Sequence, residues 1–416
     1  MPVVFLRFFY TWIIYWLIFS LIPTLNSPQN IIYAFLLQLF FVIIVIMSGS
    51  VTYTITTSNL RKTEYATEVK KFLPNAHRLI KRGVYISIFG LLLNLIGKTY
   101  YSGINLFQRP AQIRSEWLSA GAEGANIFSI LSYLSGFTFF ASAILIVSLR
   151  GWLQKKKAVF YFISCLLLLI VNSVLIGGRS GVLLFLAMVT SCFFQENQKS
   201  KPTFKSLSLS PSVITLLLCL FLYVSFIFYD RAALASTVIS EYVINFMPYL
   251  GFAYDSKAQI EPLKNFFSVL HLIGAYLTHS LNSFSHVLGT DEAGGLSIFK
   301  NIYDISQKLI WFLPDVEERF LVGRFLSLPG ALFYQLGIFG LICGGIILGC
   351  LTGFVFKKKN VSFQSYFWRA FMEVHLILSP LVLALDFLFL PFILAGYFVL
   401  RVLAGRRILL RRHLLS

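Results

Sequence analysis

Residues 31–52 read IIYAFLLQLFFVIIVIMSGSVT, a stretch that contains no charged side chain. At about 1.5 Å per residue, a helix of this length spans the roughly 30 Å hydrocarbon core of a bilayer. A helix that is apolar on all sides lies either in the core of a large protein or in lipid. The composition of the whole chain decides between these two environments.

The rest of the sequence has the same apolar character. Of the 416 residues, 57% are hydrophobic and only 12% are charged, whereas soluble domains carry roughly 25% charged residues. Similar apolar runs recur, and we expect spans near residues 4–23, 31–52, 84–104, 127–149, 158–176, 182–195, 212–229, 330–355, 362–380 and 387–404. The sequence thus predicts an all-α, polytopic transmembrane helix bundle that forms a single integral membrane domain over residues 1–416.

The basic residues are distributed unevenly about these spans. Assigning the loops alternately to two sides places most of the 35 lysines and arginines on one side, with only Glu64, Glu68 and Glu196 of the 17 acids. Cytoplasmic loops of membrane proteins carry an excess of Lys and Arg. We therefore predict that this side, which includes both termini, is cytoplasmic. The net charge of +18 then reflects topology rather than a nucleic-acid partner.

Residues 230–329 are predicted to form one large loop on the opposite, outer side. Within this loop, residues 264–288 alternate apolar and polar side chains at helical spacing, which predicts an amphipathic helix. The polar face of this helix carries three histidines: His271, His279 and His286. The helix could lie at the membrane surface, dip into it, or cross it with residues 240–256 as an extra pair. The expected number of spans is therefore ten to twelve.

A glycine-rich turn, LIGGRSG at Leu175–Gly181, separates two of the apolar runs. The distances to the basic loops on either side place Arg179 at the outer edge of the membrane. A guanidinium group presents a planar fork of donors that binds phosphate oxygens in bidentate fashion. We interpret Arg179 as a candidate binding residue for an anionic lipid head group. The alternative is an arginine that snorkels out of a short hairpin.

More charged residues are predicted at the same outer level as Arg179. They are Asp230 at the end of the seventh span and three arginines: Arg231, Arg319 and Arg324. Together the arginines could form a cationic pocket for an anionic lipid head group, preferably a diphosphate. In the alternative interpretation, each arginine pairs with a nearby acid, as Arg231 would with Asp230.

The histidines of the amphipathic helix allow two interpretations. A neutral histidine beside a sugar hydroxyl can act as a general base, whereas a polar face exposed to water needs no chemical role. His279 and His286 are seven residues apart, which is too far for both to bind one metal ion on a straight helix. We therefore predict no metal site.

The eighth predicted span is rich in glycine. Gly345, Gly349 and Gly353 recur at four-residue spacing, a pattern that allows two membrane helices to approach closely. We expect this face of the span to pack against another helix.

Three of these features together resemble the O-antigen or oligosaccharide repeat-unit polymerases of the Wzy type. The first is the LIGGRSG turn, and the second is the sequence Tyr276-Leu-Thr-His279 in the large outer loop. The third is the late glycine-rich helix with Phe333-Tyr-Gln-Leu-Gly337. The plan of many spans with one large late loop resembles these polymerases over the whole chain.

The resemblance implies glycosyl transfer between two undecaprenyl-diphosphate-linked oligosaccharides at the periplasmic face of the bacterial inner membrane. The loop 230–329 would then be periplasmic. The diphosphate would bind to the four outer arginines: Arg179, Arg231, Arg319 and Arg324. His279 or Asp230 would take the proton of the acceptor hydroxyl. No cofactor is implied, and the partners would be membrane lipid and a chain-length regulator protein.

Three other functions stay open. A flippase for lipid-linked oligosaccharides would have two related halves, and the sequence contains no internal repeat. An O-acyltransferase would place its histidine and arginines on early spans, whereas they come late here. A ligase that moves finished glycan to a lipid core would share most of the proposed site, and the sequence hardly separates it from a polymerase.

Overall fold

The computed structural model describes residues 2–55, 62–101, 127–176, 180–196, 238–254, 264–288, 326–357, 362–382 and 389–413, and isolated positions between residues 103 and 116 and between residues 222 and 233. All regular elements among these residues are helices, and one isolated bridge pairs Thr24 with Phe252. The prediction of an all-helical protein is confirmed for this part of the chain.

Within the described residues, six helices are long and apolar enough to cross a membrane. They are Val3–Ser20, Pro28–Ile55, Thr67–Tyr100, Leu131–Ser148, Lys155–Leu175 and Leu328–Lys357. Two shorter apolar helices cover Gly181–Cys192 and Leu390–Val402. Each of these overlaps a predicted span, although Thr67–Tyr100 begins 17 residues before the predicted span 84–104. The predicted span 362–380 corresponds to a helix, Phe363–Leu378, that is not among these apolar helices. Most of the predicted span 212–229 lies outside the described residues. The chain is thus a helical membrane protein.

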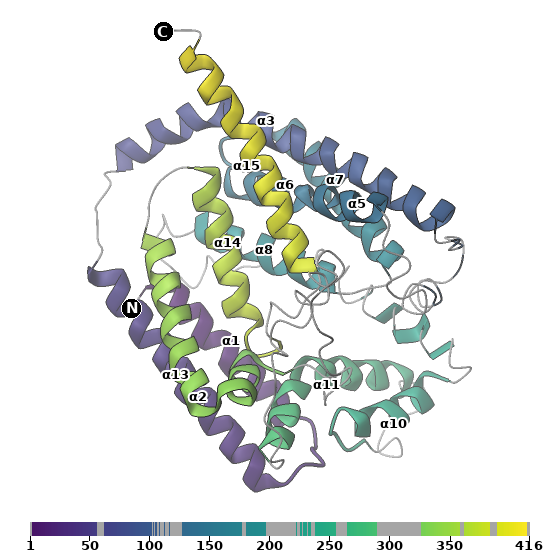
Figure 1. Ribbon diagram of the computed structural model, residues 1–416. Coiled ribbons are helices and arrows are strands. Elements are labelled where there is room, and N and C mark those ends of the chain that lie inside the picture. The colour runs from purple at the N-terminus through teal and green to yellow at the C-terminus, as the bar shows by residue number, and fades with distance from the viewer. Residues whose placement is uncertain are drawn as a thin grey trace, which may run out of the picture. The chain divides into compact units, whose positions relative to one another are not determined.

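The chain divides into two compact units. Unit 1 comprises Met1–Thr57, Leu209–Lys357 and Met372–Phe387, and unit 2 comprises Ser58–Ser208, Lys358–Phe371 and Leu388–Ser416. The helices of unit 1 are α1 (Val3–Ser20), α2 (Pro28–Ile55), α10 (Ile239–Tyr249), α11 (Lys264–Val287) and α13 (Leu328–Lys357), with the second half of α14 (Phe363–Leu378). Helix α11 packs against α1, α2, α10 and α13 (Figure 1).

Helices α2 and α13 lie side by side, and glycines of α13 make the close approach possible. A Cβ atom on Gly345 would lie 2.9 Å from Ile44 Cγ2, and one on Gly353 would lie 2.5 Å from the carbonyl oxygen of Gly49. The predicted packing of the glycine face is therefore confirmed. Residue numbers rise together along the contact, so the two helices run in the same direction.

Helix α13 is broken near its start. Gly337 has φ 61° and ψ −148°, a combination that only glycine adopts readily. The turn folds the first helical segment back, so that a Cβ on Gly340 would approach the carbonyl group of Leu332 and one on Gly344 would approach the Leu332 side chain. The sequence predicted one continuous span here, and the structure divides it at Gly337.

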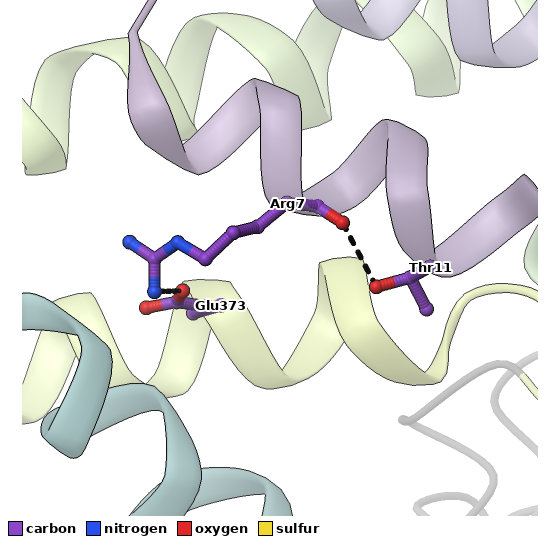
Figure 2. A network of polar contacts seen from close by, with 3 residues as sticks. All are labelled: Arg7, Thr11 and Glu373. Atoms are coloured by element: carbon purple, nitrogen blue, oxygen red, sulfur yellow. Dashed lines mark hydrogen bonds and ion pairs between the residues drawn. The ribbon is translucent and has the colours of Figure 1, made fainter. Parts of the chain in front are cut away.

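A buried ion pair joins α1 to α14 within unit 1. The Arg7 guanidinium forms a salt bridge with the Glu373 carboxylate, and their side chains are 18% and 2% exposed. Figure 2 shows the Arg7 side chain reaching from α1 to Glu373. Each charge is compensated by the other in an apolar environment, where a single charge would be costly.

Unit 2 is built around helix α6 (Thr138–Ser148), all of whose residues are buried. Its sequence, TFFASAILIVS, has apolar or small side chains on every face, which suits a helix that is surrounded. The helices around it are α3 (Lys62–Ile96), α7 (Lys155–Ile176), α8 (Ser180–Glu196) and α15 (Phe389–His413). Helix α5 (Ile127–Gly136) precedes it and packs against α3.

Candidate functional site

The amphipathic helix predicted at residues 264–288 is confirmed as α11, Lys264–Val287. Its surroundings differ from an exposed polar face, because all the polar side chains of its last three turns except His286 are buried. These residues are Thr278, His279, Ser280, Asn282, Ser283 and Ser285. A buried polar group is costly unless it finds a hydrogen-bond partner. The partners of this segment therefore define the site.

The connection between α1 and α2 supplies partners for one side of α11. Thr24 Oγ1 donates to Asn282 Oδ1 at 2.8 Å, and Asn26 Nδ2 donates to Ser285 Oγ at 2.7 Å. Asn282 Nδ2 in turn donates to the carbonyl oxygen of Gly251 at 3.0 Å. These bonds fix the end of α11 against the α1–α2 connection and the turn that follows α10.

Tyr15 of α1 binds α11 on both sides of His279. The Tyr15 hydroxyl lies 3.1 Å from the carbonyl oxygen of Thr278 and 2.6 Å from Ser280 Oγ. Ser280 Oγ donates to the carbonyl oxygen of Pro380, which follows α14, at 2.5 Å. Because Ser280 uses its proton on Pro380, Tyr15 donates its single proton to Ser280 Oγ in the shorter contact, and the carbonyl oxygen of Thr278 can only share that proton. Helix α11 is thereby held by α1 and by the end of α14.

His279, the histidine predicted to be catalytic, is 1% exposed. Its Nδ1 lies 2.7 Å from the carbonyl oxygen of Tyr276. A carbonyl oxygen only accepts, so Nδ1 carries a proton, and Nε2 is the ring atom that can act as a base when the imidazole is neutral. The Tyr276 ring also packs against the imidazole, with ring centres 5.4 Å apart. These contacts fix the orientation of the His279 ring.

The segment that contains Asp230 packs against the same part of α11. The Phe228 ring meets the Tyr276 ring edge to face, with centroids 5.9 Å apart. Asp230 follows two residues later and is half-buried. The two residues predicted as candidate bases, His279 and Asp230, therefore come from segments that contact each other through Phe228 and Tyr276.

The four arginines predicted to bind a diphosphate lie outside the described residues. They are Arg179, Arg231, Arg319 and Arg324. The sequence around Arg179 is bounded by α7, which ends at Ile176, and α8, which starts at Ser180. Lys98, in the π-helical turn Gly97–Tyr101, donates from Nζ to the carbonyl oxygen of Leu175. A buried lysine thus binds the end of α7, just before the glycine-rich sequence.

The other two histidines of α11 have different surroundings. His271 is half-buried, its Nδ1 lies 2.9 Å from the carbonyl oxygen of Phe267, and its ring packs against Tyr254. His286 is exposed. In the part of the chain that the structure describes, no group of three or more His, Cys, Asp or Glu side chains is arranged to hold a metal ion.

Sequence reasoning missed the residues that hold the site together. Tyr15, Thr24 and Asn26 are distant in sequence from α11. Each is a polar residue near the end of an apolar run, and this is the only signal that could have marked them. Glu373 was also missed, although an acid inside an apolar helix indicates a buried partner or a functional role.

A scan of the chain against protein-family models finds no match, and neither do searches of curated proteins and of solved structures.

Proposed function

We propose that this protein is a polymerase that joins oligosaccharide repeat units linked to undecaprenyl diphosphate during the synthesis of a bacterial surface polysaccharide. The observation that carries the proposal is the buried imidazole of His279, with Nδ1 2.7 Å from the carbonyl oxygen of Tyr276. A neutral histidine oriented in this way is suited to general-base chemistry. Its neighbourhood of hydroxyl and amide groups suits a sugar substrate.

In the proposed reaction, Nε2 of His279 removes the proton from a hydroxyl of the acceptor sugar. The acceptor oxygen forms a bond to the anomeric carbon of the growing glycan as the bond from that carbon to the diphosphate breaks. The diphosphate leaves with the electron pair, and the anomeric configuration is inverted. Arg179, Arg231, Arg319 and Arg324 are proposed to bind the departing diphosphate, because fixed positive charge stabilises negative charge that develops in the transition state. Asp230 is the alternative base.

The charge pattern and the apolar helices support a matching topology. We propose that the chain lies in the bacterial inner membrane with ten to twelve spans and both termini in the cytoplasm. Residues 230–329 would form a periplasmic loop with α11 within it. Reporter fusions at residues 57, 200 and 416 should read as cytoplasmic and fusions at residue 290 as periplasmic, and the reverse pattern would reject this orientation.

The test of function is the length distribution of the surface glycan. His279→Ala is expected to remove long chains from the ladder on a gel while single repeat units still reach the surface. His286→Ala is the matched control, because His286 is exposed on the same helix and should leave the ladder unchanged. Membrane abundance of both variants is measured in parallel.

Each outcome separates the candidate functions. A normal ladder from His279→Ala would remove His279 from the mechanism. Loss of surface display altogether would favour a flippase, and normal chains that fail to reach the lipid core would favour a ligase. Glycans of unchanged length that lack acyl groups would indicate an acyltransferase. Arg179→Ala tests the diphosphate-binding residues by the same readout.

A further inference from the structure

The Ser283 hydroxyl is an exception among the buried polar groups of α11. Ser283 is 1% exposed, and its Oγ has no hydrogen-bond partner among the described residues. Buried hydroxyl groups are normally bonded, and one that is not requires an explanation.

The neighbouring side chains show that partners are available in this environment. Ser280 Oγ bonds to Tyr15 and Pro380, and Asn282 bonds to Thr24 and the turn after α10. Serine and threonine in helices also commonly donate to their own backbone, as Ser285 does to the carbonyl oxygen of Asn282. Among the described residues, Ser283 makes neither kind of bond. Its hydroxyl therefore takes no part in the hydrogen bonds that fix the helix.

The position of Ser283 relates it to His279. Residues four apart lie one turn apart on the same face of a helix, so Ser283 lies directly beyond His279. At about 100° per residue, His286 falls on this face as well, and it is exposed. Along this face, His279 and Ser283 are buried and His286, at the end of the helix, is exposed.

We propose that Ser283 Oγ binds a hydroxyl group of the acceptor saccharide and holds it beside His279. This inference rests on the proposed function. A serine hydroxyl offers one donor and two acceptor positions, which matches a sugar hydroxyl that is itself both donor and acceptor. Because Ser283 is uncharged, it suits the sugar rather than the diphosphate. The unpaired hydroxyl is satisfied when the acceptor binds.

The experiment compares two serine-to-alanine variants of the full-length protein, purified in detergent. Elongation is measured with a lipid-linked oligomer of several repeats as donor and a labelled single lipid-linked repeat unit as acceptor, each varied separately, and the thermal midpoint is measured on the same samples. Ser283→Ala is expected to raise the acceptor KM about tenfold, the effect of losing one hydrogen bond, with no fall in thermal midpoint. Ser280→Ala removes bonds to Tyr15 and Pro380, so its midpoint should fall.

Three results would overturn the role of Ser283. An unchanged acceptor KM in Ser283→Ala would show that the hydroxyl does not contact the acceptor. A midpoint that falls as far as in Ser280→Ala would show that the hydroxyl has a structural partner. An increase confined to the donor KM would move the contact to the lipid-linked donor and reject the acceptor assignment.

Failure of the proposed function gives a different result. If the wild-type protein does not elongate purified lipid-linked repeat units, or if His279→Ala elongates them at the wild-type rate, the proposed mechanism fails whatever Ser283 does. If His279→Ala is inactive and Ser283→Ala keeps the wild-type acceptor KM, only the inference about Ser283 fails.

Discussion

Neutralising Glu373 should destabilise unit 1 far more than neutralising both members of its ion pair. Glu373 is 2% exposed and its salt-bridge partner Arg7 is 18% exposed. In Glu373→Met, the Arg7 guanidinium stays largely buried and loses its carboxylate. In the double variant Arg7→Met with Glu373→Met, two unbranched apolar side chains of similar length replace both charges.

The expected magnitudes differ in size and in sign. Breaking a buried ion pair by removing one partner costs about 3–5 kcal/mol, whereas replacing both partners with apolar residues is often neutral or stabilising. Because Arg7 retains some access to its surroundings, we expect the lower end of that range, about 3 kcal/mol, for Glu373→Met. At roughly 1–2 °C per kcal/mol for a chain of this length, the thermal midpoint should fall by about 3–6 °C.

The assay is thermal unfolding of the purified protein in detergent, followed by tryptophan fluorescence. Trp12 reports on this region because it is fully buried on α1, the helix that carries Arg7. Glu241→Met serves as the control, since Glu241 is an exposed acid in α10. Its midpoint should stay near that of the wild type.

Two results would refute this reasoning. A midpoint of Glu373→Met equal to that of Glu241→Met would mean that Glu373 and Arg7 do not compensate each other. A double variant that loses as much as the sum of the two single variants would mean that the charges act independently. The expected double-mutant cycle shows strong coupling, with most of the loss recovered when both charges are removed.

Two further predictions concern glycines. A Cβ on Gly90 would lie 2.5 Å from Ser135 Oγ and 2.6 Å from the Cα of Gly136, whereas a Cβ on Gly136 would meet only Gly90, at 3.8 Å. Gly90→Ala should therefore lower the free energy of unfolding by about 1–3 kcal/mol, and Gly136→Ala should be nearly neutral. Equal thermal midpoints for the two variants would contradict the close α3–α5 contact. The alanine Cβ of Gly337→Ala would meet no neighbouring atom within 4 Å, but the residue must adopt φ 61°. We therefore expect the free energy of unfolding to fall by about 1–3 kcal/mol from backbone strain alone. A thermal midpoint equal to that of the wild type would mean that the backbone at residue 337 changes to a conformation without this strain.

The positions of the apolar helices were largely predictable from the sequence. In hydrocarbon, each backbone N–H and C=O group must be satisfied within its own segment, so a long apolar run becomes a helix regardless of its neighbours. The run at residues 31–52 lies within α2, Pro28–Ile55, for this reason. The glycine spacing in α13 was equally informative, because close approach requires small residues at one-turn intervals.

The break at Gly337 was not predictable in the same way. Glycines are frequent in membrane helices without interrupting them, and several others in α13 lie in regular helix. What distinguishes Gly337 is the packing of Leu332 against Gly340 and Gly344, a contact that exists only after the chain has folded back.

The candidate site also has one part that the sequence predicts and one part that it does not. The amphipathic pattern identified α11 and placed His279 on its polar face. It could not show whether that face meets water or protein, because the partners are hundreds of residues away: Tyr15 for Ser280, and Thr24 for Asn282. For the same reason, nothing in the sequence pairs Arg7 with Glu373.

The contacts of α11 with α1 bear on how the helix is placed in the membrane. Gly274 lies against Ile22, since a Cβ atom on Gly274 would be 3.0 Å from Ile22 Cδ1, whereas Ser280 bonds to Tyr15, which comes earlier in α1. Asn282 then bonds to Thr24, beyond the end of α1.

A helix that crossed the membrane beside α1 would keep a steady register along it. Instead, the hydrogen-bond partners that α1 and the connection after it offer to α11 lie between Tyr15 and Asn26. Nor is α11 among the described helices that are long and apolar enough to span a membrane. These contacts show that α11 lies across the end of α1 rather than alongside its full length. Under the proposed function, this placement would keep His279 buried with the exposed His286 toward the membrane surface, where a substrate with a lipid tail and a sugar head would present its reacting groups.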